Sequence, residues 1–286
     1  MKIVILGAGP AGLYSALLIK KAHPTYDITI LERNPADVTY GWGVVFSDRT
    51  LAAFQRADYK TYEQITNHFV IWDAIDVRYR EETIRCGGHV IASIARKLLL
   101  HILQQRCAEL GITLCFNHEI SALNDLGTYD LLIAADGINS IVRKTYASHF
   151  RPTIAQGNAR YIWLGVHKVL TAFTFIFREN EHGLFQVHAY PFSSTSSTFI
   201  VECSEATWLN AGWDRANEPR AWPIVSDFLP MILMGHSYSR IMRNGSVFLR
   251  SQRNPGIMRI LYCSATRLIP LTSPLAQEQS WLWRTR

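Results

Sequence analysis

The stretch KIVILGAGPAGLYSALLIK at residues 2–20 constrains the fold more than any other part of the chain. It begins with a short β-branched run typical of a buried parallel strand. Gly7, Gly9 and Gly12 follow at G-x-G-x-x-G spacing. The first glycine permits a tight turn, the second lets a pyrophosphate approach the backbone, and the third lets the next helix pack on the strand. The stretch predicts a strand-turn-helix unit that binds phosphate at the helix N-terminus.

A second strand and an acidic residue complete this pattern. Residues 27–31 are largely apolar and lead to Glu32, twenty positions after Gly12, where a carboxylate can accept hydrogen bonds from an adenosine ribose. Pro10 falls in the first helical turn, where its missing N–H costs little. An ordinary βαβ unit with incidental glycines is the alternative. We interpret the combination as a dinucleotide site in a Rossmann-like α/β fold.

Length, hydropathy and cysteine content narrow the class of protein. A chain of 286 residues can form one or two domains. It has no apolar run of about 18 residues, and Met1 leads directly into the first strand, so neither a transmembrane helix nor a signal peptide is expected. The five cysteines show no C-x-x-C spacing, which fits a reducing cytoplasm better than disulfides or a zinc site. We therefore expect a cytoplasmic protein with no metal and no membrane partner.

The net charge of +6 is unevenly distributed. Residues 236–286 contain eight arginines, no lysine and one acidic residue, so this segment carries +7, and the rest of the chain is close to neutral at −1. The basic excess therefore belongs to this one unusual tail and not to the body of the protein. No nucleic-acid partner is expected.

A further strand leads to the same edge of the predicted sheet. Residues 129–134 are apolar and run into Asp136 and Gly137, with Ser140 and Arg143 close behind. A strand that ends in Asp-Gly places a carboxylate and a flexible backbone at the carboxyl edge of a parallel sheet, where ligands bind. A simple turn is the alternative. The position after a buried strand favours the functional interpretation.

The hydrophobic period changes in the second half of the chain. Alternation there predicts an antiparallel sheet with one face toward a core or a ligand. His188 and Tyr190 share one face of their strand, and cross-strand packing is the slightly favoured alternative for both. Residues 93–110 predict a helix and residues 179–183 a hairpin loop, whereas residues 51–92 are hard to assign beyond a strand suggested at 71–79. The strand-like runs are 161–168, 173–178, 184–190 and 198–203.

Four stretches carry a family resemblance in addition to the glycine motif and Asp-Gly-x-x-Ser-x-x-Arg. With those motifs they resemble the single-component FAD-dependent aromatic hydroxylases, the p-hydroxybenzoate hydroxylase class. Within this class the salicylyl-CoA 5-hydroxylases and 2-aminobenzoyl-CoA monooxygenases are most similar, and the violacein-pathway hydroxylases are more distant. The resemblance covers roughly residues 1–235. The stretches are GWGVVFSD at 41–48, YIWLGVHK at 161–168, residues 172–183, and TFIVECSEATW at 198–208.

The resemblance implies three parts and a set of cofactor-binding residues. Residues 1–155 would form an FAD-binding Rossmann-like domain, residues 156–235 an antiparallel-sheet substrate domain, and residues 236–286 an out-of-frame tail that is not a domain. Glu32 would bind the adenosine ribose, with Arg33 beside it. Asp136 and Gly137 would serve FAD and NAD(P)H together, and Arg96 would reach a flavin phosphate. The pyrophosphate would lie against Gly7, Ala8, Gly9, Pro10, Ala11 and Gly12.

The resemblance also implies a substrate region and a reaction. The antiparallel sheet would roof the aromatic ring. NAD(P)H would reduce FAD, and molecular oxygen would form a flavin C4a-hydroperoxide that hydroxylates the ring, most simply that of an aryl-CoA thioester. No catalytic residue is assigned, because the cofactor carries the chemistry. The alternatives are a hydroxylase of a free aromatic or indole-derived substrate, and an inactive truncated FAD-fold remnant. Residues at the flavin and substrate face would be Trp42, Gly43, Val44, Val45, His188 and Tyr190.

The family pattern breaks after residue 235. Members of the class carry a second flavin motif, Gly-Asp, which is absent from residues 236–286. Reading the codons of residues 259–286 one base out of register, with free choice of synonyms, gives a family-like run that contains Gly-Asp. We therefore expect a single-base shift near residues 235–237 and a truncated hydroxylase. Residues 236–286 are expected to be poorly ordered or misplaced.

Overall fold

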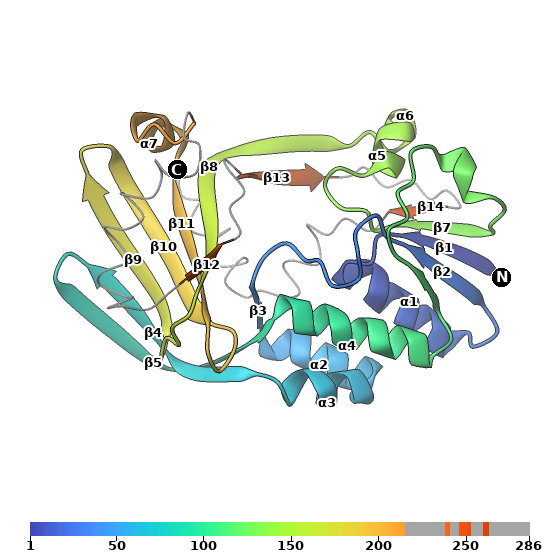
Figure 1. Cartoon of the computed structure of the whole chain (residues 1–286), viewed down its shortest axis with the longest axis horizontal. Helices are drawn as coiled ribbons and strands as arrows, with labels where there is room; N and C mark the ends of the chain where they lie inside the picture. The colour runs from blue at the N-terminus through green and yellow to red at the C-terminus, as the bar shows by residue number, and fades with distance from the viewer. Residues whose placement is uncertain (215–237, 241–245, 253–259, 263–286) are drawn as a thin grey trace.

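Two β-sheets, joined by helices and long strands, make up the chain in the computed structural model (Figure 1). The structure describes residues 1–214, 238–240, 246–252 and 260–262. The first sheet lies at the right of the view and the second at the left, with the helices α2, α3 and α4 below the space between them. No helix among the described residues is long and apolar enough to cross a membrane.

The first sheet is entirely parallel and has the order β14-β7-β1-β2-β6. Helix α1 connects β1 to β2 and packs against α4. This arrangement confirms the predicted Rossmann-like α/β unit. The strands are β1 (Lys2–Leu6), β2 (Asp27–Leu31), β6 (Thr113–Cys115), β7 (Leu131–Ala134) and β14 (Ile260–Tyr262), and the helices are α1 (Pro10–Ala22) and α4 (Arg96–Glu109).

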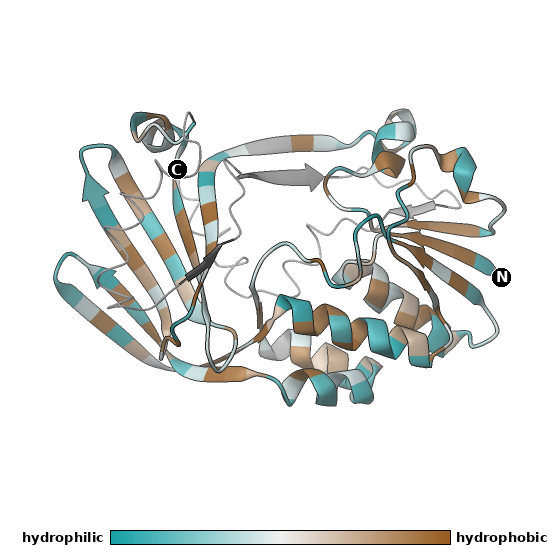
Figure 2. Cartoon of the chain, viewed as in Figure 1, coloured by the Kyte–Doolittle hydropathy of each residue, from teal (hydrophilic) through white to brown (hydrophobic). Residues whose placement is uncertain are grey.

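Apolar side chains on both faces hold this sheet in place. Its strands are predominantly hydrophobic along their length, as Figure 2 shows. Ile3 and Ile5 of β1 and Leu13 of α1 are at most 1% exposed and belong to one core beneath the sheet. Val4 and Leu132 belong to a second core on the opposite face. Burial on both faces explains why these strands read as continuous apolar runs rather than alternating ones.

The second sheet has the order β12-β8-β11-β10-β9-β4-β5-β3, and β13 also pairs with β8. Its neighbours are antiparallel, except that β4 and β9 run parallel. The predicted antiparallel sheet is therefore present, with one parallel junction. Its strands are β3 (Gly43–Phe46), β4 (Val70–Tyr79), β5 (Glu82–Ala95), β8 (Thr153–Val166), β9 (Phe173–Asn180), β10 (Gly183–Pro191), β11 (Ser197–Ser204), β12 (Tyr238–Arg240) and β13 (Ser246–Gln252).

Three local features differ from the sequence-based expectation. Helix α4 begins at Arg96 rather than at residue 93, because residues 93–95 continue β5 and pair with β3. The predicted hairpin loop at 179–183 is shorter, since β9 continues to Asn180 and β10 begins at Gly183. The segment 51–92, which is hard to assign from the sequence, contributes helices and two strands of the second sheet, of which β4 coincides with the strand suggested at 71–79.

The remaining helices are short, and α2, α3, α5 and α7 are capped by polar side chains. Ser47 Oγ accepts the Thr50 N–H at the start of α2, and an Asp58 carboxylate oxygen accepts the Thr61 N–H at the start of α3. These helices are α2 (Asp48–Ala57), α3 (Tyr59–Thr66), α5 (Ile141–Thr145), α6 (Ala147–Phe150), α7 (Glu205–Asn210) and the 3₁₀ helix η1 (Leu123–Leu126).

Most of the expected out-of-frame tail lies outside the described residues. Its described parts are the strands β12, β13 and β14.

Candidate functional site

A cleft of about 620 Å³ opens at the carboxyl ends of β1, β2 and β7. Almost all of the predicted cofactor-binding residues line it, although they come from four separate parts of the chain. Gly12 is the exception, because it lies beneath the turn rather than in the cleft. The predicted residues that line the cleft are Gly7, Ala8, Gly9, Pro10, Ala11, Glu32, Arg33, Arg96, Asp136 and Gly137.

The three glycines of the turn meet different surroundings. Gly7 has φ +99°, and a Cβ there would lie 2.4 Å from the carbonyl oxygen of Ala135. A Cβ on Gly12 would lie 1.9 Å from the carbonyl oxygen of Gly7, so α1 begins directly on the turn. Gly9 is different, because a Cβ there would have nothing within 4 Å. The backbone at Gly9 is therefore open to the cleft.

The N-terminus of α1 points its free N–H groups at this cleft without a side-chain cap. Gly9 is the N-cap residue and supplies no side-chain acceptor, and the first turn holds no acidic residue. The first N–H groups of a helix lack intrahelical partners and carry the positive end of the helix dipole. An anionic group in the cleft would satisfy both.

Glu32 joins the end of β2 to the glycine turn. One carboxylate oxygen accepts the Ala8 N–H at 2.8 Å, and the other accepts the backbone and side-chain N–H groups of Asn34 at 2.9 and 2.6 Å. The oxygen that accepts only the Ala8 N–H has a further lone pair available for a ligand hydroxyl. Asn34 and Tyr40, which line the same cleft and are bonded to each other at 3.1 Å, were not predicted.

Arg96 brings a cation to the other side of the cleft. Its backbone N–H donates to the Trp42 carbonyl at 2.7 Å, and its Nε donates to Thr39 Oγ1 at 3.0 Å. Burial lowers the pKa of Arg96 from its ordinary value, an effect that Tyr190 partly opposes. A guanidinium nevertheless remains charged in proteins. The site therefore contains a partly desolvated cation that an anionic ligand would stabilise.

The Asp-Gly loop after β7 is held in a fixed shape. Asp136 Oδ2 accepts the Ile141 N–H at 2.8 Å, and Arg143 donates to the carbonyls of Gly137 and Ile138. Asp136 Oδ1 is buried and finds no hydrogen-bond partner among the described residues. Buried carboxylate oxygens are normally satisfied. A ligand hydroxyl in the cleft would supply the missing donor.

The segment Trp42–Val45 packs between the cleft and the second sheet rather than lining the cleft. Trp42 covers Gly165 of β8, where a Cβ would lie 2.7 Å from the indole ring. In return, Trp163 of β8 covers Gly41, where a Cβ would lie 2.6 Å away. Val44 packs against the core of the first sheet, and Val45 packs against the second sheet. These contacts fix the loop that carries the Arg96 partner carbonyl.

Tyr190 and His188 lie on one face of β10, and Tyr190 contacts this loop from that face. Tyr190 donates to the carbonyl of Gly43 at 3.1 Å, and its ring stacks between Trp72 and Phe173 at 6.2 and 5.1 Å. Packing thus accounts for the Tyr190 ring. His188 is 3% exposed, and burial lowers its pKa to about 4.

Glu202 of β11 is an additional acidic residue on this face that sequence reasoning missed. Its Oε2 lies 3.8 Å from His188 Nε2, and its side chain is 12% exposed. Burial raises the pKa of Glu202 to about 7. Glu202 is therefore an acid that can change its protonation state near neutral pH.

Substituting Glu202 with glutamine is expected to raise the free energy of unfolding by about 2 kcal/mol at about pH 8 and to leave it unchanged at about pH 4. The folded state holds the Glu202 proton more tightly than the unfolded chain does, since the folded pKa is about 7. Wild type therefore loses stability as the pH rises above the ordinary glutamate pKa, and glutamine does not. Urea unfolding at both pH values measures this.

Glu179→Gln, on the exposed part of the neighbouring strand β9, is the matched control. It is expected to follow wild type at both pH values. A constant difference between wild type and Glu202→Gln across this range would contradict the prediction.

Comparisons with known proteins agree with this architecture. A sequence profile described as lycopene cyclase protein matches residues 2–140, which is less than half of the chain. Salicyloyl-CoA 5-hydroxylase of Streptomyces sp. is 41% identical over 214 residues, which are 75% of this chain and 41% of that protein. Protodeoxyviolaceinate monooxygenase of Chromobacterium violaceum is 32% identical over 243 residues, which are 82% of this chain and 64% of that protein. This chain thus spans less than two thirds of either relative.

Solved structures give the same fold at low sequence identity. 2-Methyl-3-hydroxypyridine-5-carboxylic acid oxygenase superposes with a TM-score of 0.70 at 15% identity, over 91% of this chain and 74% of that one. p-Nitrophenol 4-monooxygenase from Pseudomonas putida gives 0.67 at 13% identity, over 91% and 71%. The chain is therefore a relative of the monooxygenases named above, and it has the p-hydroxybenzoate hydroxylase-like fold of the flavin-dependent aromatic oxygenases.

Proposed function

We propose that the chain is an FAD- and NAD(P)H-dependent monooxygenase that hydroxylates an aromatic ring. The observation that carries this proposal is the 41% identity to a salicyloyl-CoA 5-hydroxylase over 214 residues, which are 75% of this chain. The chain spans 41% of that relative, so its own activity has to be tested directly. We also propose the division of the chain into residues 1–155, 156–235 and 236–286.

The cleft residues fit an FAD molecule by their chemistry. The uncapped N-terminus of α1 and Arg96 would hold the pyrophosphate. Glu32 would accept hydrogen bonds from the adenosine ribose, with Arg33 at the same end of the cleft. Asp136 Oδ1, which has no hydrogen-bond partner among the described residues, would accept from a cofactor hydroxyl. Open space at Gly9 would let the phosphates approach the backbone.

The protein's own part in the reaction would be binding, orientation and exclusion of water. A bound flavin, once reduced by NAD(P)H, supplies the activation of molecular oxygen for insertion into the ring. The loop with Trp42 and Gly43 would separate the cleft from the inner face of the second sheet. The aromatic side chains on that face would hold the ring in surroundings with little water.

An aryl-CoA thioester is the substrate class that we propose first. It follows from the name of the Streptomyces relative, which is a salicyloyl-CoA 5-hydroxylase. A free aromatic or indole-derived substrate is the second candidate, and the protodeoxyviolaceinate monooxygenase of Chromobacterium violaceum favours it. Coupled NADH or NADPH oxidation with salicyloyl-CoA, 2-aminobenzoyl-CoA and the corresponding free acids separates the two candidates. Failure of the purified chain to retain FAD would instead indicate an inactive remnant.

Gly9→Val is expected to weaken FAD binding at least about tenfold while costing the fold no more than about 1 kcal/mol. Gly9 has no neighbour within 4 Å of a Cβ and has φ −70°, so valine fits the backbone but fills the space beside the α1 N-terminus. Titration of the purified chain with FAD, followed by flavin fluorescence, measures the affinity.

Urea unfolding of the same samples shows whether the fold is intact. Val4→Ala, in the core on the far face of the sheet, is the opposite control, because it lowers stability without touching the cleft. Equal FAD affinity of wild type and Gly9→Val would remove the glycine turn from the proposed site.

A further inference from the structure

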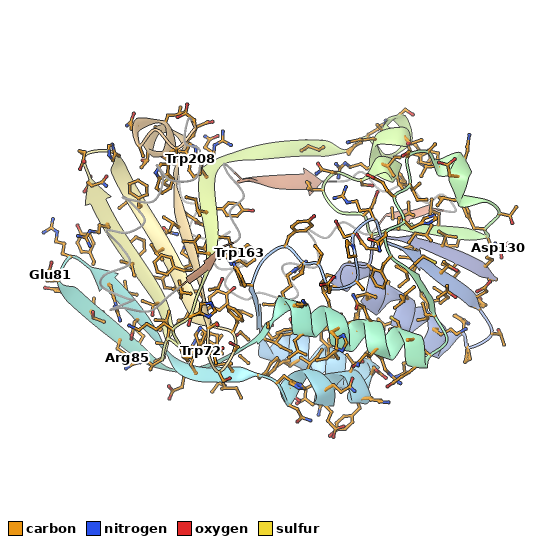
Figure 3. The ribbon with its side chains drawn as sticks, in the orientation of Figure 1. Trp72, Glu81, Arg85, Asp130, Trp163 and Trp208 are labelled. Carbon is orange, nitrogen blue, oxygen red and sulfur yellow. The ribbon has the colours of Figure 1, made fainter. Side chains whose placement is uncertain are left out.

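The two faces of strands β8 to β11 are chemically different. One face carries fully buried aliphatic and aromatic side chains, such as Phe185 and Val201, packed under Trp208 of α7. The other face carries aromatic side chains that are only half-buried: Tyr161, Trp163, Phe175 and Phe177. Trp163 of β8 and Trp72 of β4, the strand that pairs with β9, lie on the side of the second sheet that is nearer the first sheet, whereas Trp208 lies beside α7 and packs with Phe185 and Val201 (Figure 3). The half-buried face is therefore the one that turns toward the cofactor cleft.

A polar cluster interrupts this aromatic face. Glu202 lies directly opposite Gln186 in the antiparallel pairing of β10 and β11, and His188 is the next residue on the same face. Gln186 Nε2 and His188 Nε2 are 2.5 Å apart, and the amide donates when the ring is the neutral Nδ1–H tautomer. The edge of His188 also meets the Phe175 ring, at 5.1 Å between centroids. Three hydrogen-bonding side chains thus converge beside an aromatic wall.

Glu202 is largely buried, and the described residues place no charged cation beside it. Within the part of the chain that the structure describes, its only ion-pair neighbour is His188, and burial holds His188 neutral. Burial of an acid without a charged partner is unfavourable, so this position is not explained by stability. Near neutral pH the carboxyl group can accept or donate a hydrogen bond.

The polar cluster lies beyond the end of the cleft, and Tyr190 lies between the two. Tyr190 contacts the loop at Gly43, and the charge of Arg96 acts on its hydroxyl at the cleft wall. His188 is two residues farther along β10, a rise of about 7 Å. That distance is comparable with the length of one substituted aromatic ring.

We propose that Glu202, oriented by His188, binds the hydroxyl or amino substituent of an aromatic ring that lies against the half-buried face of the second sheet. The inference rests on the proposed function and deepens it, because it assigns the group that selects ring-hydroxylated or ring-aminated substrates. Glu202 forms a hydrogen bond to the substituent, and Phe175 and Trp163 contact the ring. A substrate without the substituent leaves the buried carboxyl group unpaired, which is the strongest basis for discrimination in such a site.

The test uses two neutral ring probes that differ by one hydroxyl group, 2-hydroxybenzamide and benzamide. Their dissociation constants are measured by calorimetry on the full chain with FAD added. Wild type is expected to bind 2-hydroxybenzamide at least about tenfold more tightly. Glu202→Leu is expected to bind the two probes equally, and Glu202→Gln to discriminate to an intermediate degree, since an amide still forms a hydrogen bond. His188→Phe is expected to reduce the preference, because Glu202 loses its orienting neighbour.

Glu179→Leu, on the exposed end of β9, is the matched control and is expected to keep the full wild-type preference. An equal preference in wild type and Glu202→Leu overturns the inference, as does a wild type that binds both probes with one affinity. In either case the proposed function stands. If wild type binds neither probe, both the inference and the aromatic substrate fail, and the FAD titration of the same sample decides whether the cofactor site stands.

Discussion

Replacing Asp58 with alanine is expected to lower the free energy of unfolding by about 3–5 kcal/mol, as is typical when one partner of a buried ion pair is removed. The Asp58 side chain is 2% exposed. Its carboxylate accepts hydrogen bonds from Lys21 at 2.6 Å, from Arg106 at 2.9 and 3.1 Å, and from Thr61. It thereby ties α1, α3 and α4 together. Its loss leaves the Arg106 cation without its buried partner.

The effect should disappear in acid. Burial alone would raise the pKa of Asp58, but hydrogen bonds from Arg106, Lys21 and Thr61 outweigh it and hold the pKa well below the ordinary value. The unfolded chain therefore takes up this proton first as the pH falls. The stabilisation by Asp58 is complete above about pH 5 and is lost progressively below about pH 4. Wild type and Asp58→Ala should thus converge in stability toward low pH.

Urea unfolding across this pH range is the measurement. Lys60→Ala is the control, because Lys60 and Glu109 form a solvent-exposed pair at 2.8 Å that should contribute little. An Asp58→Ala variant as stable as wild type at neutral pH would show that the cluster contributes little to stability. A pH-independent difference would mean that the charge of Asp58 is not the stabilising feature.

Strands β1, β2 and β7 of the first sheet could be predicted from the sequence because their signals are local, whereas β14 lies in the segment expected to be an out-of-frame tail. The glycine spacing, the apolar runs and Glu32 each lie within a few residues of the element that they define. The cleft follows from them, since parallel strands end at one edge. The placement of Asp136 and Gly137 at this edge could be predicted in the same way, because an apolar strand directly precedes them.

The second sheet could be predicted only in part, because much of it depends on distant pairing. Strands β4 and β5 have mixed polarity, and β4 joins the sheet through a parallel contact with β9, about a hundred residues away in the chain. The start of α4 is set by β3, which takes residues 93–95 into the sheet. Neither the β4–β9 pairing nor the β3–β5 pairing can be inferred from local residue propensities.

Buried polar clusters were the least predictable features. Glu202 shares a face with His188 only in the β10–β11 register, and Asp58 meets Lys21 and Arg106 only after three helices pack. The sequence shows each as an ordinary charged residue. Alternation along residues 198–203 could have placed Glu202 on one face, but not beside a histidine.

Gly12→Ala is expected to lower the free energy of unfolding by about 3 kcal/mol, at the upper end of the cost of overpacking. In an unobstructed helix alanine would be favoured over glycine by about 1 kcal/mol. Here the new Cβ would lie 1.9 Å from the Gly7 carbonyl oxygen and 3.3 Å from the Ala135 Cβ. Neither Gly7 nor the strand end at Ala135 can yield easily, because Gly7 N–H donates to Leu31 and Ala135 N–H donates to Leu6.

Helix α1 must therefore move away from the turn, and its N-terminus moves with it. FAD affinity should fall together with stability in Gly12→Ala, as measured by urea unfolding and FAD titration. Gly9→Ala is the control that separates a change in stability from a change in FAD affinity. Its new Cβ meets nothing within 4 Å, so helix α1 stays in place and the free energy of unfolding should not fall as it does in Gly12→Ala. A Gly12→Ala variant with wild-type stability would mean that α1 can shift without cost. In that case the close packing of α1 on the glycine turn would not be needed to position the phosphate-binding N–H groups at the cleft.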